Sequence, residues 1–130
     1  MSAFRLAVLA SGTGTNLQAI LDELHGSEGI EVCGVGSDKP DAMALERARS
    51  AGVEAGAFPR AEYADRAARD GAMADWLEGL GVDLVVLAGY MQLLSPPFIA
   101  RFRGRIVNVH PALLPSFPGL HTHQRALEAG

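Results

Sequence analysis

Short apolar runs alternate along this chain with segments whose apolar residues recur at helical spacing. The runs at residues 6–10, 30–35, 53–58 and 83–88 predict strands, and a further run leads into Asn108. Continuous apolar strands are typical of a parallel sheet that is buried on both faces. The alternation therefore favours an α/β protein with a Rossmann-like parallel sheet and helices on both faces.

Start and stop signals mark the first two expected helices. Thr15 and Gln18 form a capping box at the start of one helix, directly after a glycine-rich turn. Asp41 is placed to cap the next helix, which Gly52 ends.

Two more helices are expected in the second half of the chain. A longer helix has an apolar face that runs from Tyr63 to Leu80, with Gly81 as its stop. A short helix starts at the Ser-Pro-Pro sequence of residues 95–97 and ends before Gly104, because proline is well tolerated only in the first turn.

The composition describes one globular domain over residues 1–130, with 48% apolar and 20% charged residues. A formal net charge of −4, without a Lys/Arg run, gives no reason to expect a nucleic-acid partner. The longest apolar run, residues 84–88, is too short to span a membrane, and residues 1–5 show no signal peptide. We therefore expect a cytoplasmic protein without membrane contact, in which Cys33 is a small buried hydrophobe.

Two polar side chains interrupt the last expected strand. Asn108 and His110 alternate with Val107 and Val109, so the period of a strand places the polar pair on one face. An amide N–H beside an imidazole suits a reaction in which negative charge grows on a carbonyl oxygen and a nitrogen leaving group needs a proton. The alternative is a pair of core polar residues that bind backbone groups.

Three unusual segments, residues 11–16, 89–94 and 108–115, fall at the carboxyl ends of expected strands. Ligands of parallel α/β sheets bind beyond these ends. The convergence favours a functional site, and we expect Asn108 and His110 to point into the same cleft as the loop of residues 12–16.

The first segment, Ser-Gly-Thr-Gly-Thr-Asn at residues 11–16, runs from a strand into a helix. Glycine lets the backbone approach a ligand closely, and free N–H groups at a helix N-terminus bind anions, so the segment predicts a phosphate site. It is not the dinucleotide fingerprint, since Leu17 stands where the third glycine is required, and it lacks the lysine of a P-loop. A tight turn without a ligand is the alternative.

The remaining histidines and serines do not support a metal site or a serine hydrolase. His121 and His123 have no second cluster of Cys, His or carboxylates near them in the sequence, so no metal is expected. The serines at 11, 95 and 116 do not stand in a Gly-x-Ser-x-Gly elbow, which argues against a serine hydrolase.

Four motifs together resemble the glycinamide ribonucleotide formyltransferases of purine synthesis. They start at residues 11, 87, 107 and 118 and read Ser-Gly-Thr-Gly-Thr-Asn-Leu-Gln-Ala-Ile, Leu-Ala-Gly-Tyr-Met-Gln-Leu-Leu-Ser, Val-Asn-Val-His-Pro-Ala-Leu-Leu-Pro and Pro-Gly-Leu-His-Thr-His. The resemblance runs in order along the whole chain. It implies the N-terminal part of the formyltransferase fold and, without a metal, formyl transfer from the co-substrate 10-formyltetrahydrofolate to the amine of glycinamide ribonucleotide.

The resemblance also implies roles for individual residues. The phosphate of the phosphoribosyl substrate would be held by Gly14, Thr15 and Asn16. The folate would be contacted by Arg60, Met91, Gln92, Leu93, Leu94 and Asn108. Asn108 and His110 would be catalytic, with the amide and a protonated imidazole stabilising the oxyanion. A cis bond is implied between Leu114 and Pro115.

Two features depart from the family pattern. Gln92 stands where some relatives carry arginine, which matters for folate affinity if that side chain holds the pterin ring. Family members also continue beyond the segment that matches Gly130, into a part that holds a catalytic aspartate. We therefore expect a chain limited to residues 1–130 to be impaired, and to self-associate through an unpaired sheet edge.

Several other functions stay open. Formyltetrahydrofolate hydrolase and methionyl-tRNA formyltransferase share the Asn-x-His pattern, although the start at residues 11–16 favours an enzyme with a small phosphorylated substrate. A phosphate- or nucleotide-binding module without catalysis is a second possibility. A dinucleotide oxidoreductase is a third, supported by residues 12–14 and by Asp38 after the second expected strand.

Overall fold

The computed structural model describes residues 3–27 and 29–109 of the 130-residue chain. These residues form strands that alternate with helices, as the apolar pattern predicts. The elements are β1 (Phe4–Leu9), α1 (Thr15–Leu24), β2 (Ile30–Ser37), α2 (Met43–Ser50), β3 (Glu54–Ala57), a 3-10 helix η1 (Arg60–Glu62), α3 (Arg66–Gly79), β4 (Leu84–Leu87), α4 (Pro96–Arg101) and β5 (Ile106–Asn108).

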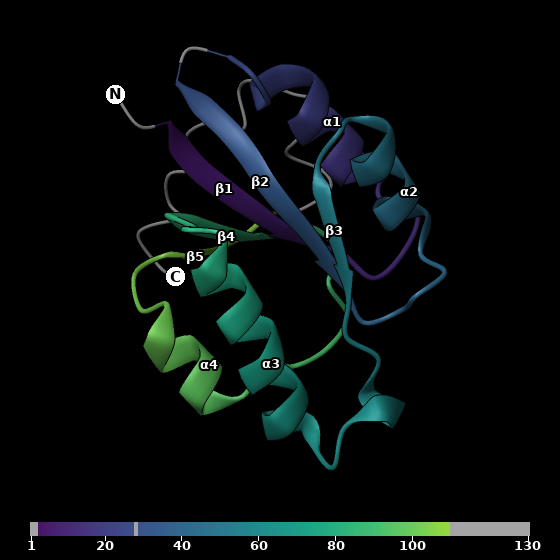
Figure 1. Ribbon diagram of the computed structural model, residues 1–130, viewed down its shortest axis with the longest axis vertical. Helices are drawn as coiled ribbons and strands as arrows, with labels where there is room; N and C mark the ends of the chain where they lie inside the picture. Colours follow the sequence, from purple (N-terminus) through teal and green to yellow (C-terminus); the bar gives the residue numbers. More distant parts are fainter. Residues whose placement is uncertain (1–2, 28, 110–130) are drawn as a thin grey trace.

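The strands lie in one parallel sheet in the order β3-β2-β1-β4-β5. Helices α1 and α2 cover one face of this sheet, and α3 and α4 cover the other (Figure 1). The predicted fold class, a Rossmann-like α/β protein, is confirmed. The chain builds outward from β1 through β2 to β3 and then returns to place β4 on the other side of β1, so the strand order reverses between β1 and β4. Ligands bind at such reversals.

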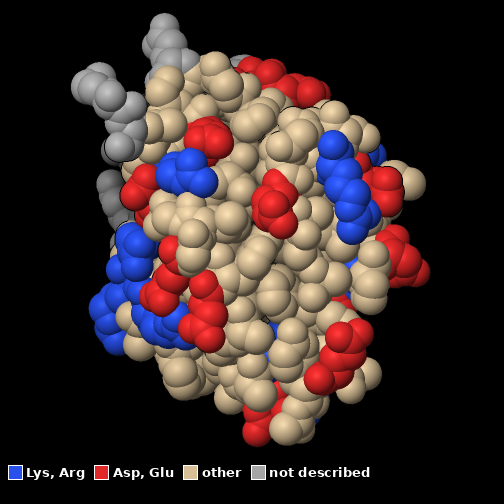
Figure 2. Space-filling view, viewed as in Figure 1, with Lys and Arg blue, Asp and Glu red and all other residues tan. Residues whose placement is uncertain are grey.

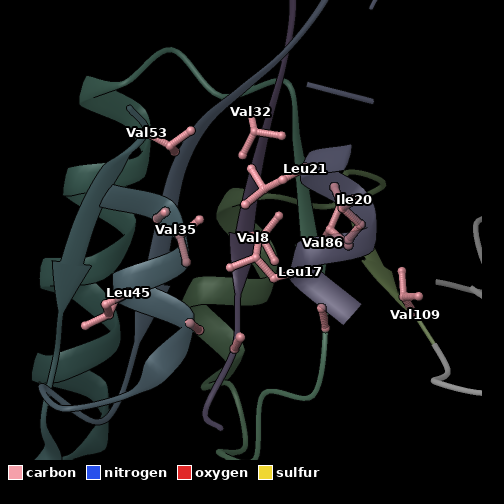
Figure 3. Close-up of a cluster of buried hydrophobic side chains, with 14 of the residues drawn as sticks. Val8, Leu17, Ile20, Leu21, Val32, Val35, Leu45, Val53, Val86 and Val109 are labelled. Carbon is pink, nitrogen blue, oxygen red and sulfur yellow. The ribbon is translucent and has the colours of Figure 1, made fainter. Parts of the chain in front are cut away.

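The core under α1 and α2 joins β-branched strand residues to one apolar stripe of each helix. Figure 3 shows side chains of this cluster between the strands and the two helices, with Leu17, Ile20 and Leu21 on α1, Leu45 on α2 and Val109 at the edge of the cluster. Both Val107 and Val109 belong to the cluster, as the strand period predicts. Because alternate strand residues face opposite ways, Asn108 projects to the other side of the sheet.

The opposite face is filled by α3 and by aromatic side chains from α4 and its end. The rings of Phe98 and Phe102 pack with their centroids 5.0 Å apart. Trp76 of α3 lies against strand residues that have no side chain, since a Cβ atom added at Gly56 would lie 3.0 Å from its ring. Cys33 is buried in this cluster, as predicted, and burial raises the pKa of its thiol.

Gly36 of β2 lies beside the fully buried Leu9 of β1, and an added methyl group there would lie 2.9 Å from Leu9 Cδ2. We expect Gly36→Ala to lower the free energy of unfolding by about 1–3 kcal/mol, because an overpacked core must shift. Gly71→Ala is the matched control: Gly71 lies inside α3 with nothing within 4 Å of the added methyl group. That variant should gain up to about 1 kcal/mol, because alanine is the better helix former. Denaturant unfolding measures both variants, and a Gly36→Ala variant as stable as the parent would contradict the close packing.

The predicted capping box at the start of α1 is wrong. The N-cap is Gly14, in a left-handed conformation with a φ of 79°, and no side chain caps the helix. Thr15 is already the first helical residue, so its hydroxyl is not placed at the cap position. The Gln18 side chain is used elsewhere, because its Nε2 donates to Asp22 and its Oε1 accepts from Arg47.

Of the other three helices, only α4 begins where the sequence signals predict. The N-cap of α2 is Ala42, and no side chain bonds to this helix start. The prediction that Asp41 caps α2 is therefore wrong. Helix α3 begins after Asp65, whose carboxylate accepts from the backbone N–H of Ala68 at 2.8 Å, and Tyr63 therefore lies before the helix. Helix α4 begins after Ser95, as predicted, with proline in its first turn.

Opposite charges join α3 to α4 at the surface. Arg101 Nη2 lies 2.8 Å from Asp75 Oδ1 and also pairs with Glu78. In Figure 2, basic and acidic side chains lie next to each other where α3 and α4 reach the surface. Exposed pairs of this kind contribute little stability. In the part of the chain that the structure describes, no helix has the length and apolarity needed to cross a membrane.

Candidate active site at the carboxyl edge of the sheet

The loops after β1 and β4 are bonded to each other where the strand order reverses. Ser11 is buried just after β1, and its Oγ accepts a 2.7 Å hydrogen bond from the backbone N–H of Met91. The Ser11 N–H donates in turn to the carbonyl of Gly89 at 3.2 Å. Two of the three predicted site segments therefore meet. The third begins at Asn108, which lies opposite Leu87 in the register of β5 with β4.

The residues predicted to hold a phosphate lie at the N-terminus of α1. Gly14 is buried, Thr15 is exposed as the first helical residue, and Asn16 is half-buried. Because no side chain caps α1, the N–H groups of its first turn are not bonded by a capping group. Free N–H groups and the positive end of the helix dipole favour an anion at this position.

Arg47 of α2 holds the same loop and was missed by the sequence analysis. Its Nε donates to the carbonyl of Thr13 at 2.7 Å, and its Nη1 donates to Gln18 Oε1 at 3.1 Å. The guanidinium therefore fixes the loop and adds a positive charge beside the predicted phosphate position. No sequence pattern marks Arg47, because it meets the loop only when α2 packs beside α1.

The segment predicted to line the folate pocket, residues 91–94, displays large apolar side chains. Met91 and Leu93 are 76% and 75% exposed, whereas Leu94 packs onto the α3–α4 cluster. The middle of the segment is tied to the end of β2, because Gln92 Nε2 donates to Asp38 Oδ2 at 3.0 Å. An anchored loop with apolar side chains in solvent offers a surface on which a flat ring can pack.

Buried polar side chains lie near this loop. The sequence analysis named Asp38 and Ser95 for separate reasons, and it did not predict that the group comes together. Within residues 3–27 and 29–109, the buried side-chain atoms without a hydrogen-bond partner are Asp38 Oδ1, Arg69 Nη2, Tyr90 Oη and Ser95 Oγ. Burial raises the pKa of the Tyr90 phenol, a nearby Arg69 opposes this rise, and the charges of Asp38 and Asp70 add to it. Tyr90 therefore stays protonated at neutral pH.

The remaining predicted residues are placed unequally. Asn108 is exposed at the end of β5, on the sheet face where Leu87 and Ile106 pack. Arg60 is exposed in η1, and its side chain donates to the carbonyl of Tyr63 at 3.1 Å. Among the described hydrogen bonds, none joins Arg60 to residues 91–94. The contact of Arg60 with folate therefore stays a prediction.

Some predicted features lie outside the described residues. They are His110, the Leu114–Pro115 bond, His121 and His123. The shared cleft of Asn108, His110 and residues 12–16 therefore stays a prediction. In the described part of the chain, no three His, Cys, Asp or Glu side chains are grouped so that they could hold a metal ion.

A parallel sheet with a glycine loop and a helix N-terminus at its reversal point defines a Rossmann-like α/β protein. In this class of protein the carboxyl edge of the sheet is the candidate position of a small-molecule site. A family model described as formyl transferase matches residues 4–130. The chain belongs to the formyl transferase family. The similar proteins described next confirm the resemblance that the four sequence motifs carry to the glycinamide ribonucleotide formyltransferases.

Similar proteins cover nearly the whole of this chain. It is 48% identical over 127 residues to the phosphoribosylglycinamide formyltransferase of Haemophilus influenzae, a match that covers 97% of this chain and 60% of that protein. It is 46% identical over 129 residues to the trifunctional purine biosynthetic protein adenosine-3 of Drosophila melanogaster, with 97% of this chain and 10% of that protein covered. The crystal structure of glycinamide ribonucleotide transformylase 1 from Symbiobacterium toebii superposes with a TM-score of 0.78 at 52% identity, with 98% of this chain and 61% of that chain covered.

Proposed function

We propose that the protein carrying this chain transfers the formyl group of 10-formyltetrahydrofolate to the amine of glycinamide ribonucleotide, a step of purine synthesis. The observation that carries the proposal is the hydrogen bond from the Met91 N–H to Ser11 Oγ, because it joins the predicted phosphate loop to the predicted folate loop. The substrate pair is supported by the name of the H. influenzae relative. This chain spans 60% of that relative, so the activity is proposed for the full-length protein.

Each loop has its own part in binding. Gly14, Thr15 and Asn16 bind the phosphate through the N-terminus of α1, and residues 91–94 line the pterin pocket. The Gln92 side chain is already bonded to Asp38, so main-chain groups of the loop hold the pterin. An arginine at position 92 is then not required for folate binding. Arg60 and Asn108 complete the folate contacts in this proposal.

The chemistry needs one oxyanion donor and one proton donor. Asn108 donates its amide N–H to the formyl oxygen as the substrate amine attacks the formyl carbon and that oxygen becomes negative. A protonated His110 stabilises the same oxygen and supplies a proton to the folate nitrogen as its bond to the formyl carbon breaks. The amine nitrogen loses one proton and the folate nitrogen gains one, so the step balances.

An assay of the full-length protein with both substrates tests the proposal. We expect tetrahydrofolate to appear only when glycinamide ribonucleotide is present, because the amine is the acceptor. Formate release without an acceptor would indicate a hydrolase, and formylation of methionyl-tRNA would indicate the tRNA-directed enzyme.

Thermal-shift measurements test for a dinucleotide oxidoreductase and for a binding module without catalysis. We expect stabilisation by glycinamide ribonucleotide and by a folate analogue. Stabilisation by NAD alone would indicate the oxidoreductase. Binding of the ribonucleotide without turnover would indicate the non-catalytic module.

Two coarser expectations accompany the proposal. We place the protein in the cytoplasm, where purine precursors and folate are used. Self-association of a chain limited to residues 1–130 also stays a prediction: β5 lies at an edge of the described sheet, and an edge strand can pair with another chain.

A further inference from the structure

We infer that Asp70 is a positioning residue, which sets the geometry of the folate-side loop (residues 89–95) through the backbone N–H of Ser95. This inference rests on the proposed function, because that function makes residues 91–94 of this loop the lining of the pterin pocket. Asp70 lies on α3 with its side chain fully buried, and its Oδ2 accepts a 2.6 Å hydrogen bond from the Ser95 N–H. Ser95 ends the loop and is also the N-cap of α4, so one contact places both.

The second oxygen of Asp70 is held by its neighbour. Arg69 is fully buried as well, and its Nε donates to Asp70 Oδ1 at 2.7 Å. Its Nη1 reaches the carbonyl of Phe58 at 3.5 Å, while Nη2 has no partner in the described chain. Burying two charges carries a large desolvation penalty, so a pair with incomplete hydrogen bonding is weak evidence for added stability. The orientation that Arg69 imposes on the Asp70 carboxylate explains the presence of this buried pair better than a gain in stability does.

The folate-side loop is thereby held at three places from three different elements. Ser11, after β1, binds its first half, and Asp38, after β2, binds its middle. Asp70, on α3, binds its end at Ser95. Of the exposed apolar residues, Met91 itself makes the first of these contacts, and Leu93 lies between the second and the third. A binding surface that is already fixed loses less conformational freedom when a ligand binds. The three contacts should therefore raise the affinity of the loop for folate.

The two polar groups of Ser95 allow a matched test at one position. Ser95→Pro replaces the N–H that donates to Asp70 by a ring carbon. The φ of −72° and ψ of 152° at Ser95 allow proline, but the Asp70 carboxylate, 2.6 Å from that nitrogen, must move aside. Ser95→Ala removes only the hydroxyl, which has no hydrogen-bond partner in the described chain. Asp70→Asn is an independent variant, which removes the charge at nearly constant volume.

Binding of a folate analogue to the full-length protein, measured by calorimetry, is the first readout. We expect Ser95→Pro and Asp70→Asn to weaken this binding about 10- to 100-fold, the range for loss of a hydrogen bond to a charged group. Ser95→Ala should bind the analogue like the parent. In steady-state kinetics the KM for 10-formyltetrahydrofolate should rise, while the KM for glycinamide ribonucleotide stays within about twofold, because the phosphate loop is not held by Asp70.

A purely structural role predicts different results. Equal binding by Ser95→Pro and Ser95→Ala, or a parallel rise in both KM values, would overturn the inference. If Ser95→Pro does not fold in a thermal scan, Asp70→Asn decides, with Asp75→Asn on the exposed side of α3 as its control. A parent protein that binds no folate analogue would overturn the proposed function instead, so the two failures are distinguishable.

Discussion

Asn108→Ala in the full-length protein is expected to lower turnover about 100- to 1,000-fold, which is the effect of removing one oxyanion donor. The partner of the amide N–H is an oxygen that becomes negative only during the reaction, so binding of glycinamide ribonucleotide should hardly change. Asn108 is exposed at the end of β5, and its loss leaves the core intact. Turnover at saturating substrate and a separate binding measurement give the two quantities. His110→Ala should behave in the same way.

The control for this prediction is Arg103→Ala. Arg103 has an exposed polar side chain and lies before the amino end of β5. It should leave both turnover and binding unchanged, because substrate is proposed to bind at the other end of the strand. If Asn108→Ala reduced binding and turnover by the same factor, Asn108 would be an ordinary binding residue. The proposed catalytic role would then be wrong.

Gly14→Ala is expected to damage both stability and binding of the phosphorylated substrate. The backbone φ of 79° at Gly14 is left-handed, which costs other residues about 1–2 kcal/mol. The added methyl group would also lie 2.8 Å from the Cα atom of Ala44, which belongs to the backbone of α2 and cannot turn away. Overpacking of this kind adds about 1–3 kcal/mol. The loop or α2 must therefore move, and the N-terminus of α1 moves with it.

Denaturant unfolding and the KM for glycinamide ribonucleotide measure the two effects. Gly12→Ala in the same loop is the control for stability, because an added methyl group there meets nothing within 4 Å and the φ is not positive. We expect its free energy of unfolding to stay within about 0.5 kcal/mol of the parent. Equal losses in the two variants would show that the contact with α2 does not shape the loop.

The fold could be predicted from local patterns because each pattern has a direct physical cause. The buried strands are continuous apolar runs, and alternation with helices leaves few ways to build a sheet. Ser95 and the prolines after it correctly predicted the start of α4. The cap signals at Thr15 and Asp41 were wrong, because Gly14 and Ala42 are the N-cap residues and neither helix start has a side-chain cap. A cap pattern shows what a side chain could bond, and packing decides whether it does.

The candidate site was predicted only in part, because packing between distant elements also decides which of its contacts form. Residues 11–16 and 89–94 were identified because glycines and polar residues at strand ends are unusual within one short segment. Arg47 and Asp70 were not, because each lies on a helix with ordinary surroundings in the sequence. Their role appears only when α2 packs beside α1 and when α3 comes close to Ser95.

The amino-acid sequence was sufficient for the α/β alternation, the loops at the strand ends and the Asn108 position, since all of these depend on residues close together in the chain. Strand order, the bond from Met91 to Ser11 and the buried pair of Arg69 with Asp70 were decided by the tertiary structure alone. These contacts form between elements that folding brings together, and adjacent residues such as Arg69 and Asp70 pair only because burial excludes water as a partner. Local sequence sets what each group can bond, and packing selects the bonds that form.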